Sequence, residues 1–345
     1  MNLNYPYVII NEYSFMTSEV FITGATGFVG SHLVDALIER GYIVNCLVRK
    51  KSNLKWLEGK PVKIVYHDSE NATTYSVIES ALKRSKYIYH VAGKISAISR
   101  EDFMKGNAGL TRWLIERIFN SGAKPERFLL VSSIAACGPG KGTLPVQESQ
   151  EPNPVSAYGE SKLAQEKIAL EFSREIPVTI VRPPPVYGPR DTGMLPAIKA
   201  LKIGIIPKWG KGIKTNFVFV SDLVDGIIMA AENKSSAGEI YNIAGSENLP
   251  VHEALEKIAR SAGKRVFKVT IPVPLMWTLA ILTEFKIKIS RRPSIFNLEK
   301  MKEFKEENWT VDITKAKNDL GYEPRIGLEE GGLITWKWYI ENGWI

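Results

Sequence analysis

Tyr158 and Lys162 stand four positions apart in a stretch that the residue pattern predicts to be helical, residues 157–174. At that spacing both side chains lie on one face of the helix. Because an ammonium favours the charged form of a neighbouring phenol, Lys162 would lower the pKa of Tyr158 from its usual value of about 10. Tyr158 could then exchange a proton with a substrate oxygen while hydride moves at the adjacent carbon. The pair therefore suits the interconversion of an alcohol and a carbonyl compound.

Two serines upstream supply a partner for this pair. The apolar run 128–131 predicts a buried strand, and Ser132 and Ser133 follow it directly. Side chains at the carboxyl ends of parallel strands face the ligand crevice, so the Ser133 hydroxyl could hydrogen-bond the same substrate oxygen. A tyrosine and a lysine at this spacing also occur by chance on surface helices. Their combination with the serines and with the turn described next favours a catalytic site.

A glycine-rich turn follows the first predicted strand, residues 19–23, and precedes a predicted helix, residues 31–40. Glycine at the first position permits the tight turn, the second lets backbone N–H groups approach a pyrophosphate, and the third lets the helix pack closely on the sheet. The helix N-terminus favours the phosphate charge. The residues predicted to bind a dinucleotide here are Gly24, Thr26, Gly27, Phe28, Val29 and Gly30. Lys162 would hold the nicotinamide ribose, Tyr158 would also contact the cofactor, and Ser132 would contact the cofactor and support Ser133.

The end of the second predicted strand indicates which dinucleotide binds. NAD binders place an acidic side chain there to bond the ribose hydroxyls, but this chain has Val48 followed by Arg49. A guanidinium suits a 2′-phosphate, so the pattern favours NADP(H), with NAD(H) and a merely solvated basic loop as alternatives. Asp68, after the third strand, could accept a bond from the adenine amino group or simply cap its loop.

The fourth predicted strand, residues 87–91, is followed by small residues. Ala92 and Gly93 would let the cofactor lie across the edge of the sheet. His90 fits a packed core histidine better than a catalyst.

Strands alternate with helices from Val20 to about Gly188, which predicts an α/β fold whose parallel sheet is covered on both faces. Beyond that point the pattern breaks into Gly/Pro-rich loops, short strands and scattered helices. We therefore predict an N-terminal extension (1–15), a cofactor-binding domain (16–187) to which later segments return, and a smaller, mainly substrate-binding lobe (188–345).

The composition excludes several other classes of protein. The 345 residues, 44% hydrophobic with a net charge of +8, are an ordinary globular mixture. Two cysteines, Cys46 and Cys137, cannot form a disulfide framework, and no Cys/His cluster has the spacing of a metal site. We see no nucleic-acid motif, no membrane-spanning run and no signal peptide. The expected setting is cytoplasmic, with a small molecule as substrate.

Several motifs together resemble the extended short-chain dehydrogenases/reductases. They are Thr-Gly-Ala-Thr-Gly-Phe-Val-Gly at 23–30, Val-Ser-Ser at 131–133, Tyr-Gly-Glu-Ser-Lys at 158–162, Arg-Pro-Pro-Pro-Val-Tyr-Gly-Pro at 182–189, Phe-Val-Phe-Val-Ser-Asp-Leu at 217–223 and Lys-Ala-Lys-Asn-Asp-Leu-Gly-Tyr-Glu-Pro at 315–324. The resemblance implies a Rossmann-type fold with a smaller C-terminal lobe and a catalytic triad of Ser133, Tyr158 and Lys162. It also implies a homodimer.

The resemblance assigns further residues. Asn107 matches a family asparagine that organises a proton-relay water, or it caps and packs its segment. Pro185 and Val186 would border the nicotinamide. Cys137 departs from the tyrosine that sugar epimerases often have there.

Two branches of this family compete. Nucleotide-sugar epimerases and dehydratases place an arginine where Thr215 stands, and dehydratases carry acids where this chain has Ile-Ala-Ala at 134–136. Lys214 could substitute for the arginine. The second branch, dihydroflavonol reductases and 3β-hydroxysteroid dehydrogenases, acts on bulky apolar alcohols and ketones, and the Val48-Arg49 pair resembles its reductases. We favour an NADP(H)-dependent reductase or dehydrogenase of this second branch.

Residues after several predicted strands are candidates for substrate contact, and one segment of the second lobe is a candidate for membrane contact. Lys94, Tyr187 and Met194 follow predicted strand ends and could touch substrate together with Ser133. Residues 271–282 are apolar, uncharged and flanked by cations, a pattern found in segments that lie on a membrane surface. A helix that packs the lobe and has a solvated rim explains the same pattern, and we favour it over peripheral membrane contact.

Overall fold

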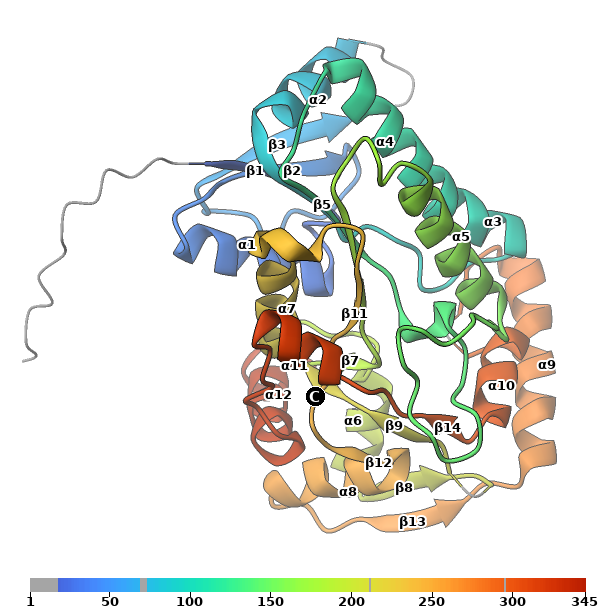
Figure 1. Ribbon diagram of the computed structural model, residues 1–345. Helices are drawn as coiled ribbons and strands as arrows, with labels where there is room; N and C mark the ends of the chain where they lie inside the picture. Colours follow the sequence, from blue (N-terminus) through green and yellow to red (C-terminus); the bar gives the residue numbers. More distant parts are fainter. Residues whose placement is uncertain (1–17, 69–72, 211, 295) are drawn as a thin grey trace, which may run out of the picture.

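The computed structural model describes residues 18–68, 73–210, 212–294 and 296–345. The predicted N-terminal extension, residues 1–15, lies outside the described residues. Figure 1 shows a sheet flanked by helices in the upper part of the view and a smaller lobe below it, built mainly from residues beyond 188.

Among the described residues, seven parallel strands form the central sheet, in the order β11-β6-β5-β4-β1-β2-β3. Apolar runs form these strands because both faces of the sheet are covered, and every residue of β5 is buried. The strands are β1 (Glu19–Thr23), β2 (Ile43–Arg49), β3 (Val62–His67), β4 (Ser85–His90), β5 (Arg127–Val131), β6 (Val178–Arg182) and β11 (Ile240–Asn242). The predicted Rossmann-type doubly wound parallel sheet is confirmed.

Two layers of helices cover the sheet. On one face α1 (Phe28–Glu39) and α7 (Val220–Glu232) form one apolar core with the strands. On the other face α2 (Thr73–Arg84), α4 (Leu110–Ser121) and α5 (Ala157–Glu171) form a second core. Helix α1 begins at Phe28, earlier than predicted, because Gly27 caps it and accepts a bond from the Ser31 N–H at 2.9 Å.

The smaller lobe packs around a third apolar core. Its helices are α6 (Leu195–Lys202), α8 (Val251–Ser261), α9 (Val273–Ser290), α10 (Leu298–Lys305) and α12 (Leu328–Glu341). Its strands are β7 (Val186–Tyr187) with β10 (Val218–Phe219), β8 (Ile205–Lys208) with β13 (Phe267–Thr270), and β12 (Asn248–Pro250), β9 (Lys214–Asn216) and β14 (Asn308–Trp309). Helix α11 (Thr314–Leu320) instead packs on α7 and β11, with Ala316 in the first apolar core. Because α7 and β11 belong to the sheet layers, the chain returns to the first domain before it completes the lobe.

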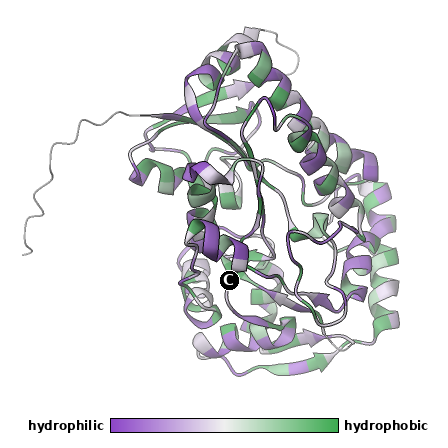
Figure 2. Ribbon diagram, viewed as in Figure 1, coloured by the Kyte–Doolittle hydropathy of each residue, from purple (hydrophilic) through white to green (hydrophobic). Residues whose placement is uncertain are grey.

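Short helices complete the connections. They are α3 (Arg100–Met104), the π-helix η1 (Lys105–Gly109), and the 3₁₀ turns η2 (Ile134–Ala136) and η3 (Lys234–Ser236). Figure 2 shows apolar residues concentrated along the central strands and mixed colours on the outer helices. Within the described ranges, none of the helices has both the length and the apolar character needed to cross a membrane.

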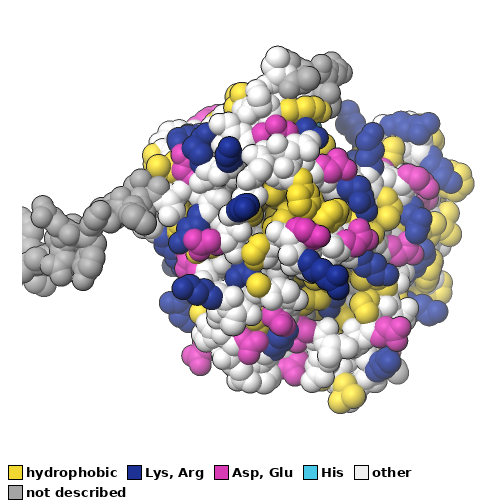
Figure 3. Space-filling model, turned by 45° about the horizontal axis from the view of Figure 1, so that its top comes forward, with side chains coloured by type: hydrophobic (Ala, Val, Ile, Leu, Met, Phe, Trp, Pro, Cys, Tyr) yellow, Lys and Arg dark blue, Asp and Glu magenta, His cyan; other side chains and the backbone are white. Residues whose placement is uncertain are grey.

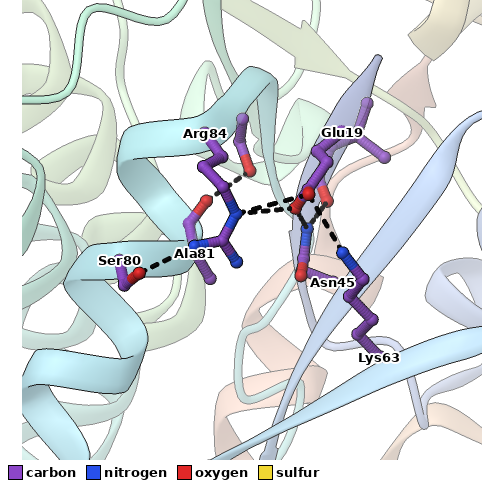
Figure 4. A network of polar contacts seen from close by, with 8 residues as sticks. Glu19, Asn45, Lys63, Ser80, Ala81 and Arg84 are labelled. Carbon is purple, nitrogen blue, oxygen red and sulfur yellow. Dashed lines mark hydrogen bonds and ion pairs between the residues drawn. The ribbon is translucent and has the colours of Figure 1, made fainter. Parts of the chain in front are cut away.

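A polar network ties together the amino ends of the first strands (Figure 4). Glu19, at the start of β1, accepts bonds from Asn45 and Lys63 at 2.9 Å each and pairs with Arg84 at 3.3 Å. Burial would raise the pKa of Glu19, but these partners lower it below its usual value. The network lies at the amino ends of the strands, on the opposite edge of the sheet from the predicted site residues. It therefore stabilises the fold and takes no part in the predicted site.

Candidate active site

The glycine turn between β1 and α1 has the close geometry that a dinucleotide requires. Gly24 has a φ of +78°, and a Cβ on it would lie 2.7 Å from the Ala92 nitrogen. A Cβ on Gly30 would lie 2.1 Å from the Gly24 oxygen, which shows why the helix tolerates only glycine there. The α1 N-terminus, with Gly27 as its cap, follows directly. The turn therefore fits the pyrophosphate site that the sequence predicts, with Thr26, Phe28 and Val29 in it.

The carboxyl end of β2 carries the cation predicted to select the cofactor. Arg49 is exposed there, and its side chain forms no ion pair among the described residues. Its neighbour Lys50 pairs with Asp68 at 2.6 Å. Asp68 thus has a cationic partner at one carboxylate oxygen, and the adenine contact remains a prediction.

The end of β4 leaves room beside Lys162, the lysine of the predicted triad. A Cβ on Gly93 would lie 3.0 Å from Asn107 Oδ1 and 3.5 Å from Lys162 Nζ. Glycine therefore keeps a cradle open between these two side chains, which fits a nicotinamide ribose held by Lys162. His90, the last residue of β4, is fully buried, and its Nδ1 is 2.7 Å from Thr23 Oγ1. Burial lowers the pKa of His90 to about 3, so it is the neutral core histidine that the sequence indicated.

Asn107 lies in the π-helix η1, and such bulges occur often at functional sites. It is fully buried. Its Oδ1 accepts the Lys94 N–H at 2.7 Å, and its Nδ2 donates to the Lys94 carbonyl at 3.2 Å and to Ser161 Oγ at 2.8 Å. These bonds join the loop after β4 to helix α5. They agree with the alternative in which Asn107 caps and packs its segment.

Ser133 and Tyr158 come together from different elements. Ser133 follows β5 and caps η2, accepting the Ala135 N–H at 3.2 Å. Tyr158 lies in the first turn of α5, which Ser156 caps by accepting the Gly159 N–H at 3.1 Å. Burial raises the pKa of Tyr158 to about 12, a hydrogen bond with the Ser133 side chain opposes the rise, and the charge of Glu303 adds to it.

Lys162 lies one turn further along α5 and is buried. Its ammonium donates to the Val131 carbonyl at 2.8 Å and to Gln165 Oε1 at 2.6 Å. Burial lowers its pKa to about 8, against the opposing charge of Glu166. The expected lowering of the Tyr158 pKa by Lys162 does not occur in this structure, because the ammonium is directed at these two oxygens and burial of the phenol dominates.

A buried charged cluster that sequence reasoning missed lies behind the triad. Glu166 and Arg182 form a two-bond pair at 2.9 and 2.6 Å, and Ser132 donates its hydroxyl to the same carboxylate. The predicted cofactor role of Ser132 therefore does not fit, since its hydroxyl is directed into the interior. A signal was present: Gln165 and Glu166 follow Lys162 by three and four positions, on the same face of the helix.

Helix α10 of the smaller lobe covers the start of α5, a contact that the sequence did not reveal. Glu303 accepts the Ser156 hydroxyl at 2.7 Å, and Glu299 accepts the Ala157 N–H at 2.7 Å. Acidic groups suit the amino end of a helix, which explains why these two glutamates hold α10 there. The start of α5, which carries Tyr158 and Lys162, is thus fixed by residues from both parts of the chain.

The predicted substrate contacts are only partly compatible with the structure. Tyr187 is 2% exposed and donates its hydroxyl to the Gly327 carbonyl at 3.2 Å, so it is a core residue of the smaller lobe instead. The Lys94 ammonium pairs with Asp102, and its contact with substrate remains a prediction. Met194 is half-buried, packs on the lobe core and caps α6.

Pro185 and Val186 lie where the two parts of the chain meet. The Pro185 carbonyl accepts the Val218 N–H at 3.1 Å, and Val186 pairs with Val218 in the two-stranded sheet of β7 and β10. This backbone follows β6 directly, so it borders the carboxyl edge of the sheet, as expected for a segment beside the nicotinamide.

The assembled groups can carry out one kind of chemistry. Ser133 can hydrogen-bond a substrate oxygen, Tyr158 can exchange a proton with that oxygen, and Lys162 can hold the ribose of a cofactor beside them. A nicotinamide dinucleotide would supply or accept the hydride.

Comparisons with known proteins agree with this geometry. The model of the NAD dependent epimerase/dehydratase family matches residues 20–244. The chain is 28% identical to the ceramide reductase of Caulobacter vibrioides, over 94% of this chain and 96% of that protein. It is 26% identical to the UDP-glucose 4-epimerase of Vibrio cholerae, over 92% of this chain and 94% of that protein.

A solved structure shows the same fold. The UDP-glucuronic acid 4-epimerase of Bacillus cereus, in complex with UDP-glucuronic acid and NAD, superimposes with a TM-score of 0.73 at 23% identity, covering 94% of this chain and 99% of that one. The glycine turn, the Ser-Tyr-Lys group and the family match together show that the chain is an NAD(P)-dependent enzyme of the extended short-chain dehydrogenases/reductases and belongs to the NAD dependent epimerase/dehydratase family.

Proposed function

We propose that the protein is an NADP(H)-dependent oxidoreductase that interconverts a secondary alcohol and a ketone on a bulky, apolar molecule. The observation that carries the proposal is the environment of Thr215, which stands where nucleotide-sugar enzymes have an arginine. Thr215 is 2% exposed, and its hydroxyl lies within hydrogen-bonding distance of two acceptors, the carbonyls of Asn216 and Trp309, at 3.1 and 3.2 Å. It therefore offers no charge to a sugar diphosphate.

Lys214 does not replace the missing arginine. It precedes Thr215 in β9 and is exposed, whereas Thr215 is buried. Since successive side chains of a strand point to opposite faces, Lys214 is directed away from the side that Thr215 occupies.

The surroundings of Tyr158 also favour an apolar substrate. Its ring packs against Phe103, with 5.9 Å between ring centroids, and Ala97 and Ala157 complete the cluster. The turn after Ser133 consists of buried Ile, Ala and Ala and supplies no acid of the kind that dehydratases use. Similarity to a ceramide reductase supports a lipid ketone as the substrate class.

Arg49 supports NADP(H) over NAD(H). Its exposed guanidinium follows β2, where a 2′-phosphate would be met by charge-assisted bonds. No acidic residue occupies the adjoining strand position, which is the buried Val48.

The first experiment identifies the cofactor. Protein is denatured, any released dinucleotide is identified by mass spectrometry, and the emptied protein is titrated with NADPH and NADH. We expect exchangeable binding with NADPH preferred by about tenfold or more, a difference of about 1.4 kcal/mol. Arg49→Asp should remove that preference. Arg174→Asp, which changes an exposed arginine in the turn after α5, should not.

The second experiment addresses the reaction. Long-chain and polycyclic ketones are offered with NADPH, and Tyr158→Phe should abolish the oxidation of NADPH without loss of cofactor binding. A nucleotide-sugar epimerase or dehydratase is the competing function, favoured by the similarity to the Vibrio cholerae epimerase. Tightly held stoichiometric NAD, together with turnover of a UDP-sugar, would replace our proposal with that one.

A further inference from the structure

Helix α9 presents large apolar side chains to solvent along most of its length. Phe285 is 61% exposed, Leu282 60% and Ile289 85%. The other exposed apolar residues of the helix are Val273, Leu275, Trp277, Leu279 and Ile281. Figure 1 shows α9 at the outer right edge of the molecule, and Figure 2 shows apolar colouring along it.

Only a narrow stripe of α9 contacts the rest of the chain. Its buried residues are Met276, Ala280 and Ile287, and two of them pack against Met301 of α10. At 100° per residue, Leu282, Phe285 and Ile289 lie on the opposite side of the helix from this stripe, and Leu279 lies on its flank. A helix that is apolar nearly all round is normally buried, so this one needs a partner that the described residues do not supply.

Cations gather at the carboxyl end of α9. Lys286, Lys288, Arg291 and Arg292 lie within seven positions, and in the part of the chain that the structure describes none of them forms an ion pair. The one acid of the helix is Glu284. Figure 3 shows dark-blue Lys and Arg side chains beside yellow hydrophobic ones at the right-hand edge of the molecule. An apolar surface rimmed by unpaired cations is complementary to anionic headgroups over acyl chains.

We propose that α9 docks the protein on the surface of an anionic lipid membrane, with its apolar side chains at the boundary between headgroups and acyl chains. The 18 residues of α9 fail the requirements for a membrane-spanning helix, so the helix lies in the plane of the surface. A second copy of the chain is a poorer occupant. Antiparallel pairing of two α9 helices would bury the cations of each against the apolar start of the other.

The position of α9 also relates the membrane to the active site. Helix α10 separates α9 from the catalytic helix, with Met301 packed on α9 and with Glu299 and Glu303 bonded to the start of α5. An apolar substrate that leaves the bilayer at α9 would therefore be separated from Tyr158 by a single helix, α10. This last step rests on the proposed function, whereas the docking itself does not.

Co-sedimentation with vesicles tests the docking. Vesicles of neutral phosphatidylcholine are compared with vesicles in which about a third of the lipid is phosphatidylglycerol. We expect binding to the anionic vesicles that weakens as salt rises. The double variant Leu279→Gln/Leu282→Gln should weaken binding by about tenfold, because two side chains no longer enter the interface. The matched control is Val77→Gln, an exposed apolar residue on α2 that is 57% accessible.

Charge reversal tests the cationic rim independently. Lys286→Glu/Lys288→Glu should weaken binding to anionic vesicles by roughly 30-fold or more, since each cation near the surface contributes about 1 kcal/mol. Lys83→Glu/Lys124→Glu makes the same change on the exposed surface of the other domain and should leave binding unchanged. An unaltered melting temperature and unaltered NADPH binding show that each variant is folded.

Trp277 gives a second readout at the helix itself. Vesicles with brominated acyl chains should quench its fluorescence, and the quenching should fall in Trp277→Phe. Equal binding by wild type and both α9 variants, or no vesicle binding together with a dimer that the leucine substitutions dissociate, would overturn the proposal. Tyr158→Phe should still bind vesicles, so failure of the proposed reaction and failure of docking are distinguishable.

Discussion

Replacing Glu166 by glutamine tests whether the buried charge cluster behind the triad is needed for stability. Glu166 and Arg182 have side chains that are each 2% exposed and are joined by two hydrogen bonds at 2.9 and 2.6 Å. Burial lowers the pKa of Arg182, but the bonds and charge of Glu166 raise it above its usual value. Glu166→Gln keeps the shape of the side chain and leaves the guanidinium without its counter-charge.

The expected loss is large for a single substitution. Breaking a buried pair by neutralising one partner costs about 3–5 kcal/mol, because the remaining charge stays desolvated. The glutamine oxygen can still accept one bond from Arg182, so we expect a loss near the lower end, about 3 kcal/mol. A domain with roughly 5–15 kcal/mol of stability would lose a substantial part of it.

The matched control is Glu171→Gln on the same helix. Glu171 and Arg112 form an exposed pair at 3.5 Å, with side-chain exposures of 58% and 48%. Such pairs contribute about 0–1 kcal/mol. Urea denaturation at pH 7, followed by circular dichroism and tryptophan fluorescence, gives the free energy of unfolding of each variant. Equal losses for the two substitutions would refute the reasoning, because burial would then have no effect on the cost of neutralisation.

Three further predictions concern the site. Burial lowers the pKa of Lys162 to about 8 from its ordinary 10.5, so between these pH values the unfolded chain binds more protons than the folded one. The free energy of unfolding of the wild type, measured by urea denaturation, should therefore rise with pH in this window relative to that of Lys162→Met. A difference between the two proteins that stays constant with pH would contradict the assignment. Gly93→Ala should abolish NADPH binding measured by titration and lower the melting temperature slightly, since its Cβ would lie 3.0 Å from Asn107 Oδ1. Gly109→Ala, whose Cβ would have its nearest contact at 3.7 Å, should bind normally. Ser156→Ala removes the cap of α5 and the partner of Glu303, and should lower the free energy of unfolding by about 1–2 kcal/mol in urea; no loss would show that the cap is dispensable.

Much of the sheet could be predicted because each long strand is an apolar run bounded by turn residues. The strands β1, β4 and β5 lie within two residues of their predicted limits of 19–23, 87–91 and 128–131. The edge strand β11 was not predicted, since three residues carry no periodic signal. Its position comes from pairing with β6, where Ile240 is in register with Ile180, and such pairing is invisible in a local pattern.

The site was predictable where residue type and spacing determine the chemistry and unpredictable where burial depends on distant elements. The Ser133–Tyr158 contact follows from a strand end and a helix start that the pattern located. Tyr187 was expected to touch substrate, but α12 packs over it so closely that a Cβ on Gly331 would lie 2.5 Å from its hydroxyl. That contact joins residues far apart in the sequence, and only the folded chain reveals it.

For helix α9, too, the sequence did not show which side chains would be buried and which exposed. The sequence identified an apolar segment with a cationic flank and left lobe packing and membrane contact as alternatives, because hydropathy does not specify which faces another element covers. In the structure the packing alternative accounts for Met276, Ala280 and Ile287 but not for the exposed apolar residues of the same helix. Packing against α10 therefore fixes the orientation of α9 and leaves its remaining apolar surface exposed. The lobe-packing alternative describes the buried face of the helix, and the proposed membrane contact concerns its exposed face.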